Sequence, residues 1–164
     1  MPKTTKRITL IGVAGTAGSG KDSATDLVCR FYGATNISTS DFVRAVARHV
    51  YDLPPDFNPI RDQLFELATF LRNEVNPATT VKLCIFKARA QNVKLAVLSG
   101  LRSMGEAEAI RQAGGIIIGV DADPRIRYER IHSRQRDTES QKTFEQFLEQ
   151  DTFENNGVSS SGPG

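Results

Sequence analysis

Apolar residues along this chain gather either in short continuous runs or in stripes with helical spacing. The run RITLIGVAG, residues 7–15, is rich in Ile and Val and ends in glycines, which is typical of a buried strand in a parallel sheet. Similar runs at residues 34–38, 93–100 and 115–123 predict three more strands. Because helical stripes separate these runs, the pattern predicts an α/β fold with a parallel sheet.

Apolar residues three or four positions apart predict the helices. The first helix follows the strand at 7–15, and Gly33 is expected to end it. The other helices are expected at residues 41–51, 60–75, 79–91 and 104–112, from Pro124 onward, and around 144–148. The stripes of the first four helices are, in chain order, Ala24, Leu27, Val28 and Phe31; Phe42, Val46 and Val50; Leu64, Leu67, Ala68, Leu71 and Val75; and Val81, Cys84, Ile85 and Ala88.

The domain organisation follows from length and local composition. A chain of 164 residues suits one domain, which we place at residues 1–154. The helices within residues 41–91 would form a helical region on one side of the sheet. Residues 155–164 read NNGVSSSGPG, and this polar, Gly/Ser-rich composition predicts a disordered tail.

Composition excludes several classes of function. Hydrophobic residues make up 39% of the chain and charged residues 24%, as in ordinary soluble globular proteins. The net charge of +2 is too small to indicate nucleic acid or membrane binding, and no apolar run is long enough to span a bilayer. Cys29 and Cys84 show no metal-ligand pattern, and neither do His49 and His132. We therefore expect a cytoplasmic protein with reduced thiols and no nucleic-acid or membrane partner.

The sequence GTAGSGKDS, residues 15–23, carries the strongest chemical signal. It fits the pattern G-x-x-x-x-G-K between an apolar strand and a helix, which is typical of a phosphate-binding loop. Glycines let backbone N–H groups surround phosphate oxygens, and the lysine adds a positive charge. The residues expected to bind the nucleotide are Gly15, Thr16, Ala17, Gly18, Ser19, Gly20, Lys21, Asp22 and Ser23.

Asp22 departs from this pattern, which usually has Ser or Thr after the lysine to bind Mg²⁺. A carboxylate is also a hard oxygen ligand, so one interpretation is that Asp22 binds Mg²⁺ directly or through water. The alternative is that Asp22 only adds favourable charge to the first helical turn, while Ser23 or water serves the metal.

Five stretches together resemble P-loop nucleoside monophosphate kinase-like proteins, in particular the adenylate kinase-like and dephospho-CoA kinase-like nucleotide kinases. They are GTAGSGKDS (15–23), ISTSDFVRAVAR (37–48), LSGLRSMGEAEAIRQAGG (98–115), VDADPRIRYERIHSRQR (120–136) and FEQFLEQD (144–151). The resemblance implies a P-loop NTPase three-layer sandwich with strand order 2-3-1-4, in which the usual fifth strand is missing or rudimentary. It also implies an enzyme that uses ATP and Mg²⁺ to phosphorylate a small phosphorylated acceptor.

The resemblance also implies roles for individual residues. Lys21 would act on the donor phosphates. Arg130 and Arg134 match an R-x-x-x-R pattern at a short lid, residues 130–138, where the first would lie near the donor base and the second would reach the phosphates, with Arg136 just beyond. The residues expected on the acceptor side are Asp41, Arg44, Arg72 and Arg102, of which Arg44 and Arg102 are also candidates for catalysis together with Lys21 and Arg134.

Ser99 is a second departure, because many relatives end this strand with Asp. A serine can hydrogen-bond a metal-bound water without neutralising charge, so the metal-binding carboxylate would have moved to Asp22. The sequence leaves the acceptor open between a nucleoside or deoxynucleoside monophosphate and dephospho-CoA. It also leaves open a degenerate protein that binds nucleotide without transferring phosphate. An uncovered edge of the fourth strand would favour a homodimer.

Overall fold

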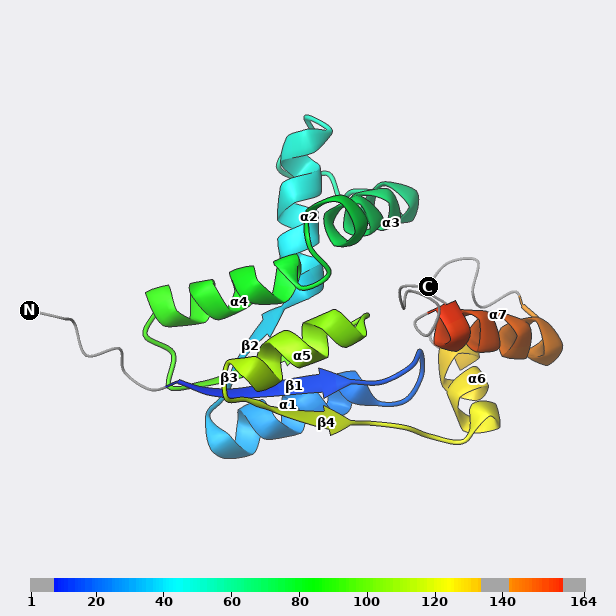
Figure 1. Ribbon diagram of the computed structural model, residues 1–164. Helices are drawn as coiled ribbons and strands as arrows, with labels where there is room; N and C mark the ends of the chain where they lie inside the picture. Colours follow the sequence, from blue (N-terminus) through cyan, green and yellow to red (C-terminus); the bar gives the residue numbers. More distant parts are fainter. Residues whose placement is uncertain (1–7, 134–141, 158–164) are drawn as a thin grey trace, which may run out of the picture.

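The computed structural model describes residues 8–133 and 142–157 of the chain. In this part of the chain the sheet has four parallel strands in the order β2-β3-β1-β4 (Figure 1). They are β1 (Thr9–Ala14), β2 (Thr35–Ser38), β3 (Leu95–Ser99) and β4 (Ile116–Gly119). The predicted fold class and strand order are confirmed, and no fifth strand follows β4 among the described residues, so β4 forms an edge.

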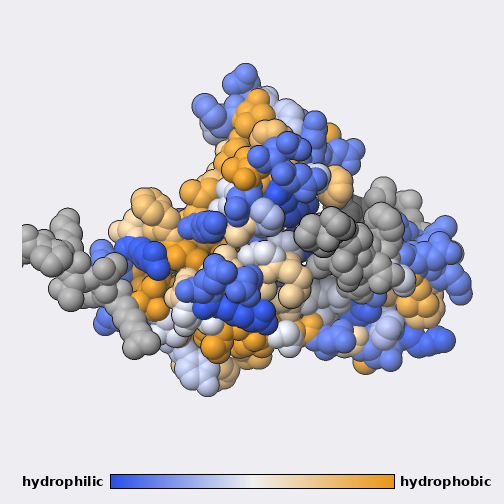
Figure 2. Space-filling model, viewed as in Figure 1, coloured by the Kyte–Doolittle hydropathy of each residue, from blue (hydrophilic) through white to orange (hydrophobic). Residues whose placement is uncertain are grey.

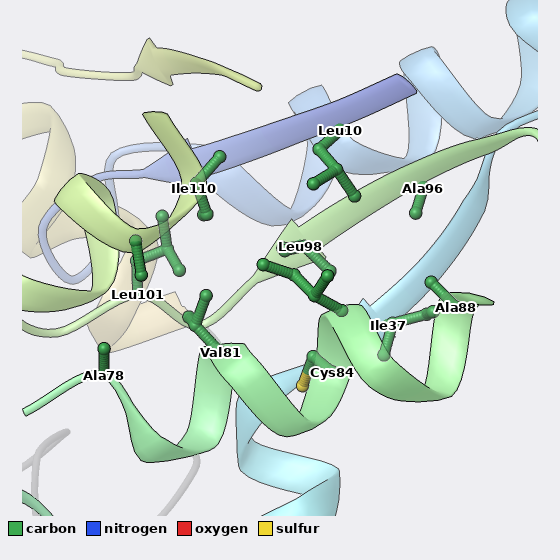
Figure 3. Close-up of a cluster of buried hydrophobic side chains, with 12 residues drawn as sticks. Leu10, Ile37, Ala78, Val81, Cys84, Ala88, Ala96, Leu98, Leu101 and Ile110 are labelled. Carbon is green, nitrogen blue, oxygen red and sulfur yellow. The ribbon is translucent and has the colours of Figure 1, made fainter. Parts of the chain in front are cut away.

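Helices cover both faces of the sheet and complete three layers (Figure 1). α1 (Lys21–Tyr32) packs on one face, while α4 (Thr79–Ala90) and α5 (Met104–Gln112) pack on the other. The main core lies between the sheet and the helices α4 and α5, where Leu10 and Leu98 from the strands meet helix side chains (Figure 3). The predicted stripe of α4 is confirmed as buried, namely Val81, Cys84, Ile85 and Ala88.

The face covered by α1 is less enclosed than the sequence pattern suggested. Leu27 and Phe31 of the predicted stripe are 52% and 74% exposed, and Thr25 is the buried residue of this helix. No other described helix packs beside α1 on this face, so the outer part of its apolar stripe stays in contact with solvent. Gly33 ends α1 in a left-handed conformation, as predicted.

A helical arm made of α2 (Thr39–Val50) and α3 (Arg61–Phe70) projects from the sheet (Figure 1). Its own small core contains Val43, Ala47 and Leu67. α2 therefore buries the face next to the predicted one, since Val50 is 55% exposed. The single helix predicted at 60–75 is also wrong in part, because Leu71–Val75 form a short π-helix, η1.

The C-terminal helices α6 (Pro124–Ser133) and α7 (Phe144–Gly157) pack on each other beyond the carboxyl ends of the strands (Figure 1). The ring of Tyr128 lies 5.4 Å from that of Phe144 and 5.8 Å from that of Phe147. α7 is longer than the helix predicted around 144–148. Its last residues, 155–157, were placed in the tail by the sequence, whereas 158–164 lie outside the described residues.

The surface carries several exposed aromatic side chains. Phe65 and Phe70 on α3 are 69% and 54% exposed, and Phe86 on α4 is 70% exposed. Figure 2 shows apolar residues reaching the surface along the helical arm and along α4. No helix within the described ranges is long and apolar enough to cross a membrane.

Candidate functional site

The glycine loop connects β1 to α1 at the carboxyl end of a central strand. No side chain caps the start of α1, which follows Gly20 directly. The first N–H groups of a helix have no partner within the helix, and the helix dipole places partial positive charge there. Lys21, half-buried at the first helical position, adds a full positive charge. This geometry is suited to bind the phosphates of a nucleotide.

The loop is packed tightly against α6. Gly18 has φ of 75°, and a Cβ at this position would lie 2.6 Å from the carbonyl oxygen of Arg127. Ser19 is 4% exposed, yet its Oγ has no hydrogen-bond partner among the described residues. Since buried hydroxyl groups are nearly always hydrogen-bonded, this Oγ is suited to bind a ligand in the loop.

Two arginines of α6 donate hydrogen bonds to the glycine loop. Arg127 is buried, and its guanidinium donates to the Oγ1 of Thr16 at 3.0 Å and to both carboxylate oxygens of Asp151 at 2.6 and 2.7 Å. The hydrogen bond with Asp151 raises the pKa of Arg127, so its guanidinium stays ionised. Arg130 donates to the carbonyl oxygens of Gly18 and Ser19 at 3.1 and 3.3 Å. Arg127 therefore links the loop to α7, and Arg130 contacts the loop directly.

A polar pocket of about 240 Å³ lies beside the loop. It forms where the start of α1 faces the carboxyl ends of β2 and β3 and the start of α2, which is where ligands bind in open α/β sheets. Its lining residues are Asp22, Thr25, Asp26, Asn36, Ser38, Asp41 and Ser99. The structure thus brings together Asp22, Asp41 and Ser99, three residues singled out from the sequence at positions far apart in the chain.

Hydrogen bonds position part of this lining. Ser99 Oγ donates to Asn36 Oδ1 at 2.8 Å, which joins the ends of β2 and β3. At the start of α2, Thr39 Oγ1 donates to the carbonyl oxygen of Gly100 at 2.8 Å. Thr25 differs, because it is 2% exposed and no residue in the described part of the chain hydrogen-bonds its Oγ1. The pocket is therefore held in shape from three elements and keeps one unpaired hydroxyl.

Asp22 and Ser99 could each offer one oxygen to a Mg²⁺ ion or to its water shell. Both line the pocket, although Ser99 Oγ is already bonded to Asn36. In the described part of the chain, no group of three or more His, Cys, Asp or Glu side chains could hold a metal ion together. Mg²⁺ usually binds through one or two carboxylates together with waters and substrate phosphates, so Asp22 could serve as its protein carboxylate.

The arginines predicted for the acceptor are not among the residues that line this pocket. Arg44 is exposed, with Nη1 at 3.1 Å from Oδ1 of Asp41. Arg72 is half-buried in η1 and donates to Thr69 Oγ1 at 3.4 Å. Arg102 is exposed after β3. None of the three is among the residues lining the pocket, and Arg134 and Arg136, with most of the lid, lie outside the described residues.

Sequence reasoning missed Thr25, Asp26, Asn36 and Ser38 as pocket residues. Thr25 and Asp26 lie one helical turn after Lys21 and Asp22, so helical spacing from the loop could have indicated them. The sequence reasoning also gave little weight to Arg127, and it missed Glu106. The buried carboxylate of Glu106 accepts hydrogen bonds from the backbone N–H of Arg102 at 2.6 Å and from Thr80 Oγ1 at 2.6 Å. Glu106 thereby fixes the turn that follows β3.

The sequence is similar to those of UPF0200 proteins. No family model matches the sequence. The chain is 31% identical over 146 residues to a UPF0200 protein of Hyperthermus butylicus, which covers 88% of this chain and 75% of that protein. It is 30% identical over 150 residues to a UPF0200 protein of Thermococcus kodakarensis, covering 87% and 76% of the two chains.

Solved structures support the fold. The structure of TT1252 from Thermus thermophilus matches with a TM-score of 0.58 and 19% identity, over 94% of this chain and 86% of that chain. A shikimate kinase from Bacteroides thetaiotaomicron matches with a TM-score of 0.55 and 12% identity, over 92% and 80%. At such low identity these matches show a fold like that of P-loop kinases, and nothing about the substrate.

Proposed function

This chain belongs to the UPF0200 family, and we propose that it is an ATP-dependent small-molecule kinase. The observation that carries the proposal is the glycine loop with its uncapped helix start, which opens beside a polar pocket at the strand ends. The loop would bind a nucleoside triphosphate, and the pocket would bind an acceptor for its γ-phosphoryl group. Phosphoryl transfer depends mainly on such positioning and on charge around the moving group.

The donor side has the residues that this reaction requires. Lys21 and the first N–H groups of α1 would bind the phosphates, and Ser19 Oγ is an additional buried donor. Arg130 already contacts the loop and would bring positive charge close to ATP. Mg²⁺ would neutralise the phosphates, with Asp22 as its protein ligand and Ser99 near its water shell.

The resemblance in sequence offers two acceptors for this kinase. The first is a nucleoside or deoxynucleoside monophosphate, in which a phosphate oxygen attacks ATP. The second is dephospho-CoA, in which a hydroxyl attacks. A protein that binds nucleotide without transferring phosphate is the competing interpretation, because Ser99 supplies no charge where many relatives have a carboxylate.

Calorimetric titration of ATP with and without Mg²⁺ tests the proposal. We expect saturable binding that requires the metal and is lost in Lys21→Ala, because the lysine charge is removed from the phosphates. Lys87→Ala is the matched control, since Lys87 is exposed on α4, away from the loop. Equal binding by the wild type and Lys21→Ala would contradict a phosphate-binding loop. Metal-dependent binding without transfer to any acceptor would favour the nucleotide-binding alternative.

A further inference from the structure

We propose that the group phosphorylated in this pocket is a hydroxyl of a neutral or cationic molecule, and not a phosphate. The inference rests on the proposed kinase function and narrows its acceptor. It is carried by the chemistry of the pocket, which has three carboxylates and an unpaired buried hydroxyl beside the phosphate loop.

The charge of the lining argues against a phosphorylated acceptor group. Asp22, Asp26 and Asp41 are its charged members, and no Lys or Arg is among the described lining residues. A phosphate monoester carries between one and two negative charges at neutral pH, so the carboxylates would repel it. Mg²⁺ bound to Asp22 would neutralise that carboxylate, and the exposed Arg44 is paired with Asp41. Asp26 would still face the phosphate monoester without a basic partner among the described lining residues.

The hydrogen-bonding character of the lining favours hydroxyls. Carboxylates accept hydrogen bonds only, and they match the donors that a polyol, a ribose or an ammonium group presents. Thr25 adds an independent sign of a ligand, since its Oγ1 is buried, has no partner within residues 8–133 and 142–157, and belongs to a residue that lines the pocket. Neutral Ser38 and Asn36 extend this surface without adding charge.

The size of the pocket limits what enters it. A water molecule occupies about 30 Å³ of the liquid, so about 240 Å³ accommodates a group of the size of a small sugar. Pockets that enclose a whole drug-sized ligand are usually larger, about 300–1,000 Å³. The pocket would therefore take a small acceptor, or one hydroxyl-bearing end of a larger acceptor.

Transfer to a hydroxyl would require only ATP with its Mg²⁺, the acceptor and a pocket carboxylate. The acceptor oxygen attacks the γ-phosphorus of ATP and a new P–O ester bond forms. The bond from the γ-phosphorus to the bridging oxygen breaks, and ADP leaves with its electron pair. The hydroxyl proton passes to a pocket carboxylate, Asp26 or Asp41, and from there to solvent.

The chemical bond in the product tests the proposal. The full chain is incubated with Mg²⁺ and ATP labelled in the γ-phosphate, in the presence of adenosine, AMP, cytidine, CMP, ribose, glucosamine, pantetheine or dephospho-CoA. We expect label in an acid-stable phosphate ester of an uncharged or cationic acceptor, namely adenosine, cytidine, ribose, glucosamine or pantetheine. An ester formed only on an anionic acceptor, such as dephospho-CoA, would overturn the inference. Label in an acid-labile phosphoanhydride, as in ADP made from AMP, would overturn the inference and leave the kinase proposal intact. Absence of transfer to every acceptor would overturn both.

Two variants connect the result to this pocket. Thr25→Val removes the unpaired hydroxyl at nearly constant volume. We expect it to leave the free energy of unfolding unchanged or higher, and to raise the KM for the acceptor. Asp26→Asn should raise that KM about tenfold, because a hydrogen bond to a charged group is lost, and leave the Kd for Mg·ATP unchanged. Asp56→Asn, an exposed loop carboxylate outside the pocket, is the control. Unchanged acceptor KM in both pocket variants would overturn the assignment.

Discussion

At the scale of single residues, the conformation of the glycine loop depends on the close approach of its backbone to α6. Gly18→Ala would introduce two costs, namely a left-handed φ of 75° and a Cβ 2.6 Å from the carbonyl oxygen of Arg127. Gly114→Ala separates them, since its φ of 83° is equally unfavourable but nothing lies within 4 Å of the added Cβ. We expect Gly114→Ala to cost about 1–2 kcal/mol in the free energy of unfolding.

Gly18→Ala is expected to cost more than this and also to weaken ATP binding, because the clash involves backbone that cannot rotate away. Urea denaturation of both variants gives the difference, and calorimetry gives the effect on ATP. Equal destabilisation by the two substitutions, with ATP affinity retained in both, would contradict a close contact between the loop and α6.

The residues of the site were predictable where chemistry depends on a local motif. The glycine loop, Asp22 and Ser99 stand out in the sequence because they occupy or depart from positions with a known physical role. Thr25 and Asn36 carry no such mark, and only the meeting of α1 with β2 gives them a place in the pocket. Arg127 was one of many arginines in its segment, and its burial depends on Asp151 in a different helix.

At the scale of elements, the ion pair of Arg127 and Asp151 joins α6 and α7 to the loop. Its side chains are only 5% and 14% exposed. We expect Arg127→Met to destabilise the protein by about 3–5 kcal/mol, because it leaves the Asp151 carboxylate largely buried without its partner. The same variant should weaken ATP binding, since Thr16 in the loop loses a hydrogen bond.

Arg125→Met is the matched control, because Arg125 is exposed and its guanidinium lies 5.0 Å from the ring centroid of Phe144. A cation–π contact at an exposed site contributes about 0.5–1 kcal/mol, so this variant should cost little. Urea denaturation compares the two, and Arg127→Met with Asp151→Leu in one chain should recover part of the loss. Similar stabilities of the Arg127 and Arg125 variants would refute the coupling.

The elements themselves were predictable in kind and order, but less so in which face they bury. α4 was predicted correctly because it packs on β2 and β3 in the main core, where its whole stripe is enclosed. α2 packs mainly on α3 and α4, so the direction of its buried face depends on their placement, and Val43 and Ala47 face the core instead of Val50. The π-helix at 71–75 has no distinct pattern in the sequence.

At the scale of the whole molecule, the apolar and polar pattern alone gave only an α/β fold. The strand order came from the family resemblance, because the pattern of one chain does not say which strands pair. The edge of β4 is left open among the described residues, and Ile116 on it is 59% exposed. The homodimer expected from this edge stays a prediction.

The stability of the whole fold should depend on pH through Cys84, which lies in the main core. Burial is the main cause that raises the pKa of Cys84 to about 11, against an ordinary value of 9.0, with Lys87 lowering it and Glu106 and Asp41 raising it. A raised pKa means that the folded state favours the neutral thiol. The corresponding stability is fully present below pH 9 and is lost as the pH rises to 11.

We therefore expect the free energy of unfolding to fall between pH 9 and pH 11 by more in the wild type than in Cys84→Ala, by an amount on the order of 2 kcal/mol. Urea denaturation at several pH values measures both curves, and other groups that titrate in this range cancel in the comparison. Cys29→Ala is the control, because Cys29 is only half-buried and should change the slope less. Parallel curves for the wild type and Cys84→Ala would mean that the thiol is solvated in the folded protein. The core around α4 would then be more open to water than the burial of Cys84 in this structure indicates.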